Sequence, residues 1–502
     1  MKSILVFGAG KSATCLIEYL LEQVELHSWN LIVADGNLEL ALSKTNSAPR
    51  SKAIQVDVQD AIQRQELVKS ADIVISLLPP HLHILVARDC VEFEKNLLTA
   101  SYADDSIRAL APAITEKKLL FLCEMGLDPG IDHMSAMQLI HQIRSQGGKI
   151  HSFRSHCGGL VAPESDDNPW HYKISWNPRN IVQAGMSGAI FKENGEVKKM
   201  DYEDLFDANR VVDIPEIGYL AWYPNRDSLG YVSLYHLEEA HTFIRTTLRY
   251  PEFCFGWKSV VDLKLTDDTI QYETDGMSLM QFFKVHMANH GFSDWIEKQL
   301  TERFAKTKEL LEKLQQLLAV EENANPAEKK EMQDFMLVDD KGDLLDINLD
   351  EVKNKAAATV AGQMHEANLA IKQLLYLGMD DNETLINKGK ASALDVLQFC
   401  LEKKLALQPT DKDMIVMLHE FEYEMDGKTQ QTNSSLVVKG KDSLRTAMAQ
   451  TVGLPLGIAA ILILTGKINL TGLHIPISPE IYEPVLKALY DKGIIFQEKH
   501  FL

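Results

Sequence analysis

The chain has few cysteines and no long hydrophobic run. Its 502 residues include six cysteines, and no two of them have the CxxC spacing of a metal or redox site. Scattered free thiols of this kind are typical of a reducing cytoplasm. The first 21 residues lack the layout of a signal peptide, and the apolar run 452–464 is too short to span a bilayer. The sequence therefore predicts a cytoplasmic protein with no metal site and no membrane partner.

Basic residues are also in deficit. Lysine and arginine total 51 against 71 aspartates and glutamates, which gives a formal net charge of −20. Because nucleic-acid affinity is built from lysine and arginine neutralising phosphates, this balance excludes a nucleic-acid partner. Any anionic small molecule must then meet a local basic pocket. Hydrophobic residues make up 45% of the chain, as in ordinary globular proteins, and its length predicts two or three domains.

The first 125 residues alternate short apolar runs with amphipathic helical stretches. Such strands, separated by helices, pair in parallel and predict an α/β fold with a doubly wound sheet. The expected strands cover residues 4–7, 31–34, 53–58, 72–78, 96–100 and 119–123.

The pattern changes twice after this first part. Residues 151–248 form short, aromatic-rich segments that predict a mixed sheet with long loops, and the chain turns helical beyond Met277, with an apolar seam at 300–318. Asp426-Gly427, between the segments 414–424 and 429–438, predicts a β-hairpin. A return to strands after a helical stretch indicates that one domain is inserted into another.

A dinucleotide-binding loop follows the first expected strand. Gly8, Gly10 and Ala13 form a G-x-G-x-x-A pattern that opens a helix. Gly8 permits the tight turn, Gly10 lets the backbone approach the pyrophosphate, and Ala13 allows close packing of helix and strand. The helix N-terminus would stabilise the phosphate charge. This context supports a nicotinamide dinucleotide as cofactor.

Asp35 closes the second expected strand, where a carboxylate can accept hydrogen bonds from the ribose hydroxyls of NAD. A 2′-phosphate at that place would meet like charge, so NAD is predicted in preference to NADP. The alternative is a turn aspartate before Gly36-Asn37. Asp57 and Leu77, at the ends of the next two expected strands, complete the predicted cofactor site.

A second turn between strand and helix lies in residues 121–134, which read FLCEMGLDPGIDHM. Asp128 stands at the carboxyl end of an expected parallel strand, which is where open α/β sheets bind ligands. The alternative is structural: Asp128 could cap a helix whose first position is Pro129. The turn alone does not decide between these two interpretations.

Together with the cofactor loop, this turn resembles the saccharopine dehydrogenases of the glutamate-forming type, also called saccharopine reductases. The family usually has YCGGLPAPE where this chain has His156 and Val161. The resemblance is carried, in family order, by TASY at 99–102, GLDPGIDHM at 126–134, HCGGLVAPE at 156–164, NP at 168–169 with YKISW at 172–176, YPNRDS at 223–228 and TLRY at 247–250.

The resemblance implies an N-terminal Rossmann-like domain with an inserted α+β domain for substrate binding and dimerisation. We place the first domain at residues 1–127 plus about 404–502 and the inserted domain at 128–403, with a helical insertion at about 277–370. The implied reaction is NAD-dependent oxidative cleavage of saccharopine to L-glutamate and 2-aminoadipate 6-semialdehyde, in lysine metabolism. The alternatives are an enzyme like carboxynorspermidine dehydrogenase and a dinucleotide-binding sensor without turnover.

The resemblance also places candidate residues for chemistry and for substrate binding. Asp128, Cys157 and Tyr102 are candidates for the catalytic site, although the sequence does not show which of them transfers a proton. Saccharopine bears three carboxylates, and arginine binds carboxylates through two parallel hydrogen bonds. The expected substrate-binding residues are Arg226, Arg249 and Lys173.

Overall fold

The computed structural model describes residues 1–295, 297–298, 335–338, 344–347 and 368–501. Packing divides the chain into two compact units, which are described separately. The apolar seam at 300–318, and most of the predicted helical insertion at about 277–370, lie outside the described residues. The first unit comprises Met1–Asp167, His171–Cys254 and Leu405–Leu502, and the second comprises Asn168–Trp170 and Phe255–Lys404.

The first unit contains a parallel sheet of seven strands in the order β20-β6-β5-β4-β1-β2-β3. Strands β1 and β4 are wholly buried, as expected for a parallel sheet covered on both faces. The doubly wound sheet predicted from the sequence is therefore confirmed. Its strands are β1 (Ser3–Phe7), β2 (Asn30–Asp35), β3 (Ser51–Gln55), β4 (Ile73–Ser76), β5 (Asn96–Thr99), β6 (Leu120–Leu122) and β20 (Gly472–His474).

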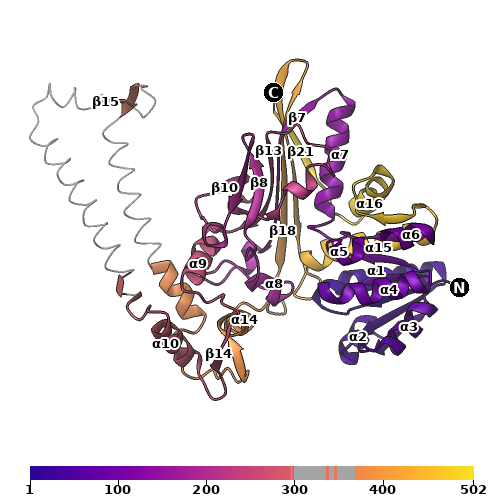
Figure 1. Ribbon diagram of the computed structural model, residues 1–502, viewed down its shortest axis with the longest axis horizontal. Helices are drawn as coiled ribbons and strands as arrows, with labels where there is room; N and C mark the ends of the chain where they lie inside the picture. Colours follow the sequence, from indigo (N-terminus) through magenta and orange to yellow (C-terminus); the bar gives the residue numbers. More distant parts are fainter. Residues whose placement is uncertain (296, 299–334, 339–343, 348–367, 502) are drawn as a thin grey trace, which may run out of the picture. The chain divides into compact units, whose positions relative to one another are not determined.

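Helices connect these strands and pack beside the sheet (Figure 1). The short 3-10 helix η1 (Lys11–Ala13) leads directly into α1, so the cofactor loop opens a helix as predicted. The helices are α1 (Thr14–His27), α2 (Leu38–Thr45), α3 (Ala61–Ser70), α4 (His83–Glu92), α5 (Asp105–Arg108), α6 (Ala111–Glu116), α7 (Ile131–Ser145), α15 (Ala447–Leu464) and α16 (Pro479–Asp491).

Helix α15 is apolar all round, because it packs against other elements on most of its surface. Within the described part of the chain it is the one helix whose length and mean hydropathy of 2.0 would allow a membrane crossing, and 78% of it is buried inside the protein. Glycines let it approach α1 closely. A Cβ atom at Gly453 would lie 2.9 Å from the backbone nitrogen of Leu16, and one at Gly457 would lie 2.7 Å from the ring of Tyr19.

The first unit also contains a mixed sheet of ten strands. Its main path is β10-β11-β13-β7-β18-β19-β21, and β8, β9 and β12 pair beside it. Asp426 and Gly427 both have positive φ in the tight turn between β18 and β19, so the predicted hairpin is confirmed. The strands are β7 (Lys149–Val161), β8 (Ala189–Glu193), β9 (Glu196–Met200), β10 (Val211–Ile214), β11 (Gly218–Pro224), β12 (Arg226–Asp227), β13 (Thr242–Arg249), β18 (Asp413–Met425), β19 (Lys428–Lys439) and β21 (Gln497–Phe501).

The C-terminal segment contributes to both sheets. Strand β20 joins the parallel sheet beside β6, whereas β18, β19 and β21 extend the mixed sheet from β7. Packing places both sheets in one unit, so it does not separate a nucleotide-binding domain from a substrate domain. The predicted assignment of about 404–502 to the nucleotide-binding domain therefore stays a prediction.

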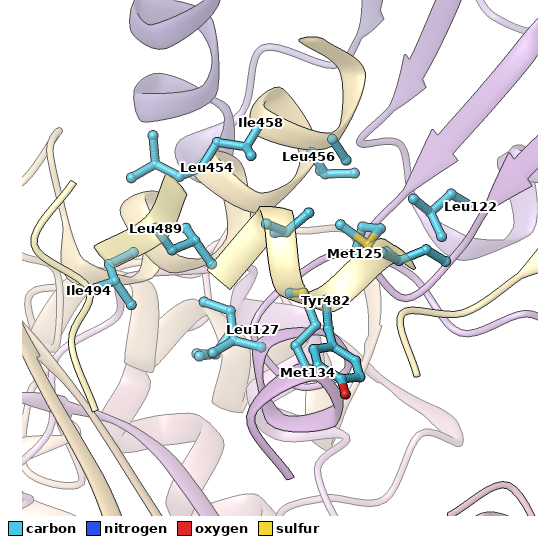
Figure 2. Close-up of a cluster of buried hydrophobic side chains, with 14 of the residues drawn as sticks. Leu122, Met125, Leu127, Met134, Leu454, Leu456, Ile458, Tyr482, Leu489 and Ile494 are labelled. Carbon is cyan, nitrogen blue, oxygen red and sulfur yellow. The ribbon is translucent and has the colours of Figure 1, made fainter. Parts of the chain in front are cut away.

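One hydrophobic core joins the two sheets within the first unit. Figure 2 shows apolar side chains of α15 and α16 facing the end of β6 and the start of α7. Burial on this scale is the main stabilising contribution to a fold, at about 25 cal/mol per Å² of apolar surface. The labelled residues are Leu122, Met125, Leu127, Met134, Leu454, Leu456, Ile458, Tyr482, Leu489 and Ile494.

The described residues of the second unit include several helices and a small antiparallel sheet in which β14 pairs with β17. A further pair, β15 (Phe335–Val338) and β16 (Leu344–Ile347), is antiparallel. Helix α8 (Pro178–Val182) belongs to the first unit, and α9 (Pro251–Asp262) begins there and continues into the second. The other elements of the second unit are β14 (Ile270–Glu273), α10 (Leu279–Asn289), β17 (Lys390–Ser392) and α14 (Ala393–Lys404).

The close approach of α15 to α1 predicts the effect of a single methyl group. Gly453→Ala should lower the free energy of unfolding by about 1–3 kcal/mol, because the new Cβ meets the backbone of α1, which cannot move aside. Urea unfolding measures the change. Gly36→Ala is the control, since its Cβ would have only one neighbour, at 4.0 Å. Equal stability of the two variants would contradict the packing described for α15.

Candidate active site

The cofactor loop has the geometry that its glycines predict. Gly8 has φ +100°, and a Cβ there would lie 2.9 Å from the carbonyl oxygen of Leu77, whereas a Cβ on Gly10 would meet nothing within 4 Å. Gly8 is thus required by the turn, and the open side of Gly10 leaves room for a pyrophosphate. Ala13 is buried against the sheet. Leu77 belongs to this site through its backbone, which packs on Gly8.

Asp35 has a different environment from the one predicted. Its Oδ2 accepts a hydrogen bond from the backbone N–H of Ala9 at 2.7 Å, and its Oδ1 accepts one from the N–H of Asn37 at 2.8 Å. Both oxygens therefore hold the backbone of the surrounding turns. Asp57 is exposed and accepts a hydrogen bond from the N–H of Gln59 at 2.9 Å, as in an Asx-turn.

The turn between β6 and α7 is very tight. A Cβ on Gly130 would lie 2.0 Å from the carbonyl oxygen of Gly126, so neither the turn nor its φ of +149° admits another residue there. The N–H of Gly126 donates to the carbonyl of Pro129 at 2.9 Å, and the N–H of Ile131 donates to the carbonyl of Gly126. This closed turn fixes the side chain of Asp128 at the carboxyl edge of the sheet.

Asp128 does not cap the helix. Helix α7 has Gly130 at its N-cap and no side-chain cap, and Asp128 Oδ1 instead accepts a hydrogen bond from Arg245 Nη2 at 2.6 Å. The same nitrogen donates to Asp132 Oδ2 at 2.8 Å. Arg245 lies on β13 of the mixed sheet, so this ion pair joins that sheet to the end of the parallel one. The structure thus rejects the capping alternative for Asp128.

The two aspartates titrate differently. Burial raises the pKa of Asp128 above its usual value, even though the charge of Arg245 opposes the change. Burial acts on Asp132 as well, but the charges of His133 and Arg245 and the N–H of Gly130 outweigh it and lower the pKa of Asp132. Environments that separate the pKa values of neighbouring acids are typical of acid–base sites. Asp128 is therefore the group of the pair that is suited to exchange a proton.

Glu124 and His133 form a second buried pair beside these aspartates. His133 Nε2 lies 2.9 Å from Glu124 Oε2, and His133 Nδ1 lies 2.5 Å from the hydroxyl of Tyr235. Tyr231 donates its hydroxyl hydrogen to Glu124 Oε2 at 3.0 Å, and its ring stacks on His133. Burial alone would raise the pKa of Glu124, but the hydrogen bond and charge of His133, together with the bonds from Ala103 and Tyr231, lower it below its usual value.

Tyr102 and Cys157, both predicted as catalytic candidates, lie within electrostatic range of Asp128. Burial raises the pKa of Tyr102, with a further contribution from Asp128 and opposition from Arg245. Burial also raises the pKa of Cys157 well above its usual value. Both groups are therefore neutral at physiological pH, so Cys157 is a buried thiol and not a thiolate nucleophile.

The three predicted substrate-binding cations differ in their surroundings. Lys173 donates to Asp167 at 2.8 Å and to Asp411 at 2.7 Å, so its charge is neutralised within the protein. Its expected role in binding substrate carboxylates stays a prediction. Arg226 is exposed, with its guanidinium 5.5 Å from the centre of the Tyr102 ring.

Arg249 is the cation with the least compensation. It is 4% exposed, it donates to the carbonyl oxygen of Leu248, and its Nε has no hydrogen-bond partner. Across the residues that the structure describes, no carboxylate forms an ion pair with Arg249 or Arg226. Tyr172 and Phe253 present their rings to the Arg249 guanidinium. A buried charge of this kind is costly unless an anionic ligand pairs with it.

His156 lies on the opposite face of the sheet from Cys157. Its Nδ1 is 2.7 Å from the Thr246 hydroxyl and its Nε2 is 3.0 Å from Glu420, so it is held away from Asp128. No group of three or more histidine, cysteine or acidic side chains in the described part of the chain could hold a metal ion.

Sequence reasoning missed Arg245, Glu124, Tyr231 and the role of His133. For Arg245 a signal was present, because Arg245 and Arg249 are four residues apart on one strand and so share a face. Thr247 lies between the two arginines on the same face and pairs with Cys157 on the neighbouring strand β7. Cys157 therefore shares this face with Arg245 and Arg249. Glu124 gave no such signal, since its partners lie on other segments of the chain.

A parallel sheet with a glycine-rich loop, and an acidic turn at its carboxyl edge, define the class of dinucleotide-binding oxidoreductases. Comparison with known families is more specific. Residues 4–122 match the saccharopine dehydrogenase NADP-binding domain, and residues 126–494 match the saccharopine dehydrogenase C-terminal domain. The chain belongs to the saccharopine dehydrogenase family.

Individual relatives agree with this assignment. The chain is 32% identical over 502 residues to the NADP(+), L-glutamate-forming saccharopine dehydrogenase of Saccharomyces cerevisiae, with 99% of each chain covered. It is also 32% identical to the α-aminoadipic semialdehyde synthase of Arabidopsis thaliana, of which it spans 44%. The solved apo structure of the Saccharomyces cerevisiae enzyme superposes with a TM-score of 0.78 at 29% identity, over 100% of both chains.

These comparisons overturn the predicted preference for NAD. The family domain over 4–122 is NADP-binding, and relatives from Saccharomyces cerevisiae and Schizosaccharomyces pombe carry NADP(+) in their names. The prediction assumed that the Asp35 carboxylate faces the adenosine ribose. Its two oxygens are instead used by backbone N–H groups, which removes the basis of that argument.

The buried ion pair predicts a pH-dependent loss of stability. Arg245→Met should lower the free energy of unfolding at pH 7 by about 3–5 kcal/mol, because it leaves two buried carboxylates without their cation. The pKa of Asp132 is lowered in the folded protein, so its contribution is present above its unfolded pKa and is lost as pH falls. The difference between wild type and variant should therefore shrink on acidification.

Urea unfolding at several pH values measures this difference. Arg226→Met is the matched control, because it removes an exposed arginine that has no ion pair with a described carboxylate. A stability loss in Arg245→Met that stays constant as pH falls from 7 to about 3, below the usual pKa of an aspartate, would contradict the assigned role of the ion pair.

Proposed function

We propose that the chain is an NADP(+)-dependent saccharopine dehydrogenase that cleaves saccharopine oxidatively to L-glutamate and 2-aminoadipate 6-semialdehyde, a reaction of lysine metabolism. The proposal is supported by the match to both family domains and by coverage of 99% of the Saccharomyces cerevisiae relative. The observation that carries it is the buried Arg249, whose charge has no carboxylate partner among the described residues.

Arg249 suits a substrate with several carboxylates. A substrate carboxylate can receive hydrogen bonds from a guanidinium and compensate the cost of burying it. Arg249 lies on the same side of the sheet as the acidic site, because the thiol of Cys157 is within electrostatic range of both Arg249 and Asp128. Exposed Arg226, beside Tyr102, supplies a second cation for another carboxylate of the same molecule. Saccharopine has three carboxylates and meets this pattern.

The cofactor loop fits a nicotinamide dinucleotide phosphate. Gly8, Gly10 and Ala13 would hold the pyrophosphate at the start of α1, where Gly10 is open on one side. Leu77 supports the loop by packing against Gly8. Bound there, NADP(+) would supply a hydride acceptor for oxidation at a substrate carbon attached to the secondary amine.

The acidic site is suited to the proton transfers of this reaction. The secondary amine of saccharopine must lose a proton before hydride transfer, and water must later add to the imine to release glutamate. Asp128, with its raised pKa, can take up and return a proton at the amine nitrogen. Tyr102 and Cys157, which stay neutral, can orient the substrate and the water by hydrogen bonding but do not act as bases.

The cellular compartment and the oligomeric state of the enzyme remain predictions. All six cysteines are buried free thiols, which agrees with a reducing compartment such as the cytoplasm. We also propose a homodimer, as the family resemblance implies.

An assay of the purified protein with saccharopine tests the proposed function. Saccharopine and NADP(+) should give NADPH, seen by its absorbance, together with glutamate and an aldehyde. NADP(+) should be used with higher catalytic efficiency than NAD, as the family domain implies. If neither NADP(+) nor NAD supports turnover of saccharopine, the proposed function is wrong. If NAD gives the higher catalytic efficiency, the cofactor assignment is wrong.

Asp128→Asn tests the proton-transfer role. The variant should lose at least about tenfold in kcat, because an amide cannot accept the amine proton. Its melting temperature should stay close to that of the wild type, since Arg245 keeps its bond to Asp132 and burial already disfavours the charge of Asp128. Asp213→Asn, which changes an exposed aspartate on β10, is the control. Wild-type turnover of Asp128→Asn at all pH values would make Asp128 purely structural.

A further inference from the structure

Glu124 is a buried carboxylate that none of the steps above uses. It lies two residues after the end of β6, it is 1% exposed, and its φ of +59° is a left-handed conformation that non-glycine residues rarely adopt. Strain of this kind persists only where the surrounding structure requires the side chain at that place. The contacts of its two oxygens show what the requirement is.

The first oxygen reaches Arg245 through one intermediate side chain. Glu124 Oε2 accepts the hydroxyl hydrogen of Tyr231 at 3.0 Å, and the Arg245 guanidinium lies 4.4 Å from the centre of the Tyr231 ring. A cation over an aromatic ring is attracted to it. Since Arg245 Nη2 holds Asp128 at 2.6 Å, the hydroxyl of Tyr231 fixes the ring on which that ion pair depends.

The second oxygen holds the segment that carries Tyr102. Glu124 Oε1 accepts a hydrogen bond from the N–H of Ala103 at 3.2 Å, and the N–H of Glu124 donates to the carbonyl of Ser101 at 3.1 Å. The backbone on both sides of Tyr102 is thus tied to Glu124. One carboxylate therefore connects two sides of the candidate active site.

We propose that Glu124 is a positioning residue that acts through Tyr231 to hold Arg245 against Asp128 and, through Ala103, to hold Tyr102. Neither Glu124 nor Tyr231 needs to touch the reacting atoms for this role. The effect that this role should have on turnover rests on the proposed function, whereas its effect on the titration of Asp128 does not.

The effect on Asp128 has a definite direction. Arg245 lowers the pKa of Asp128 against the effect of burial, so an arginine that is less well held should let that pKa rise. The titratable and charged groups that act on Asp128 from the surrounding elements are Arg245 on β13, Asp132 and His133 on α7, Arg226 on β12, Tyr102 after β5, Cys157 on β7, and Tyr235.

Tyr231→Phe is the main test, because it deletes one hydroxyl and keeps the ring beneath Arg245. We expect kcat for saccharopine to fall at least about tenfold, with KM for NADP(+) changed less than about twofold. The acid limb of the kcat profile should move to higher pH by at least about half a pH unit. A residue that only stabilises the fold would lower the melting temperature and leave this profile in place.

Glu124→Gln gives a second, independent variant. The carboxylate accepts hydrogen bonds from the N–H of Ala103, the hydroxyl of Tyr231 and Nε2 of His133. The amide has one accepting oxygen in place of two, so it cannot keep all three bonds. If Glu124 acts through Tyr231, the double variant with Tyr231→Phe should have a kcat within about twofold of Glu124→Gln alone, since coupled sites are not additive. A product of the two single effects would overturn the coupling.

Tyr482→Phe is the matched control. Tyr482 is a buried tyrosine whose hydroxyl lies 2.7 Å from Nδ1 of His141, so the change deletes a hydrogen-bonded tyrosine hydroxyl outside the candidate active site. It should leave kcat and the pH profile unchanged.

A spectroscopic readout separates this inference from the proposed function. Infrared difference spectra against Asp128→Asn follow the Asp128 carboxyl without substrate, and the titration should move to higher pH in Tyr231→Phe. If the wild type does not turn over saccharopine but this shift occurs, the proposed function fails and the positioning role stands. If the titration and kcat of Tyr231→Phe both match the wild type, the positioning role is overturned.

Discussion

The ion pairs between Arg245 and two aspartates are the interaction on which the candidate active site depends. One guanidinium nitrogen holds both Asp128 and Asp132, and all three groups are largely buried. Breaking a buried pair is costly because it leaves a charge without compensation, so the surrounding chain must keep these atoms in place. The glycine turn before α7 and the ring of Tyr231 serve that purpose. Without them, the two sheets of the first unit would not share a site.

The ion pairs of Arg245 leave two groups, Asp128 and Arg249, available for chemistry and for ligand binding. Two carboxylates compete for one arginine, so burial dominates at Asp128 and raises its pKa, whereas Asp132 is held ionised by its neighbours. Arg249, on the same face of β13, has no carboxylate partner among the described residues. The strand thus presents one arginine that is fully used within the protein and another that suits a ligand carboxylate. This division of roles is consistent with a substrate that carries both amines and carboxylates.

Much of the fold was predictable because its signals are local. Alternating strands and helices, the G-x-G-x-x-A loop and the turn at Asp426-Gly427 depend on neighbours within a few residues, and each is found as predicted. The errors came from side chains whose partners lie elsewhere in the chain. Asp35 was assigned to a cofactor ribose, yet the backbone of Ala9 uses one of its oxygens. The ion pair of Lys173 with Asp411, far away in sequence, was likewise not foreseen, and the assignment of Lys173 to substrate stays a prediction.

The sequence by itself determined the family, the doubly wound sheet and the placing of Asp128 at a strand end, because short motifs and hydrophobic periodicity encode them directly. Only the tertiary structure decided which groups surround Asp128 there. Arg245 is 117 residues away from it along the chain, and Tyr231 is 107 residues from Glu124. Contacts over such separations depend on how the mixed sheet packs against the parallel one, and burial then sets which charges are compensated and which remain for a ligand.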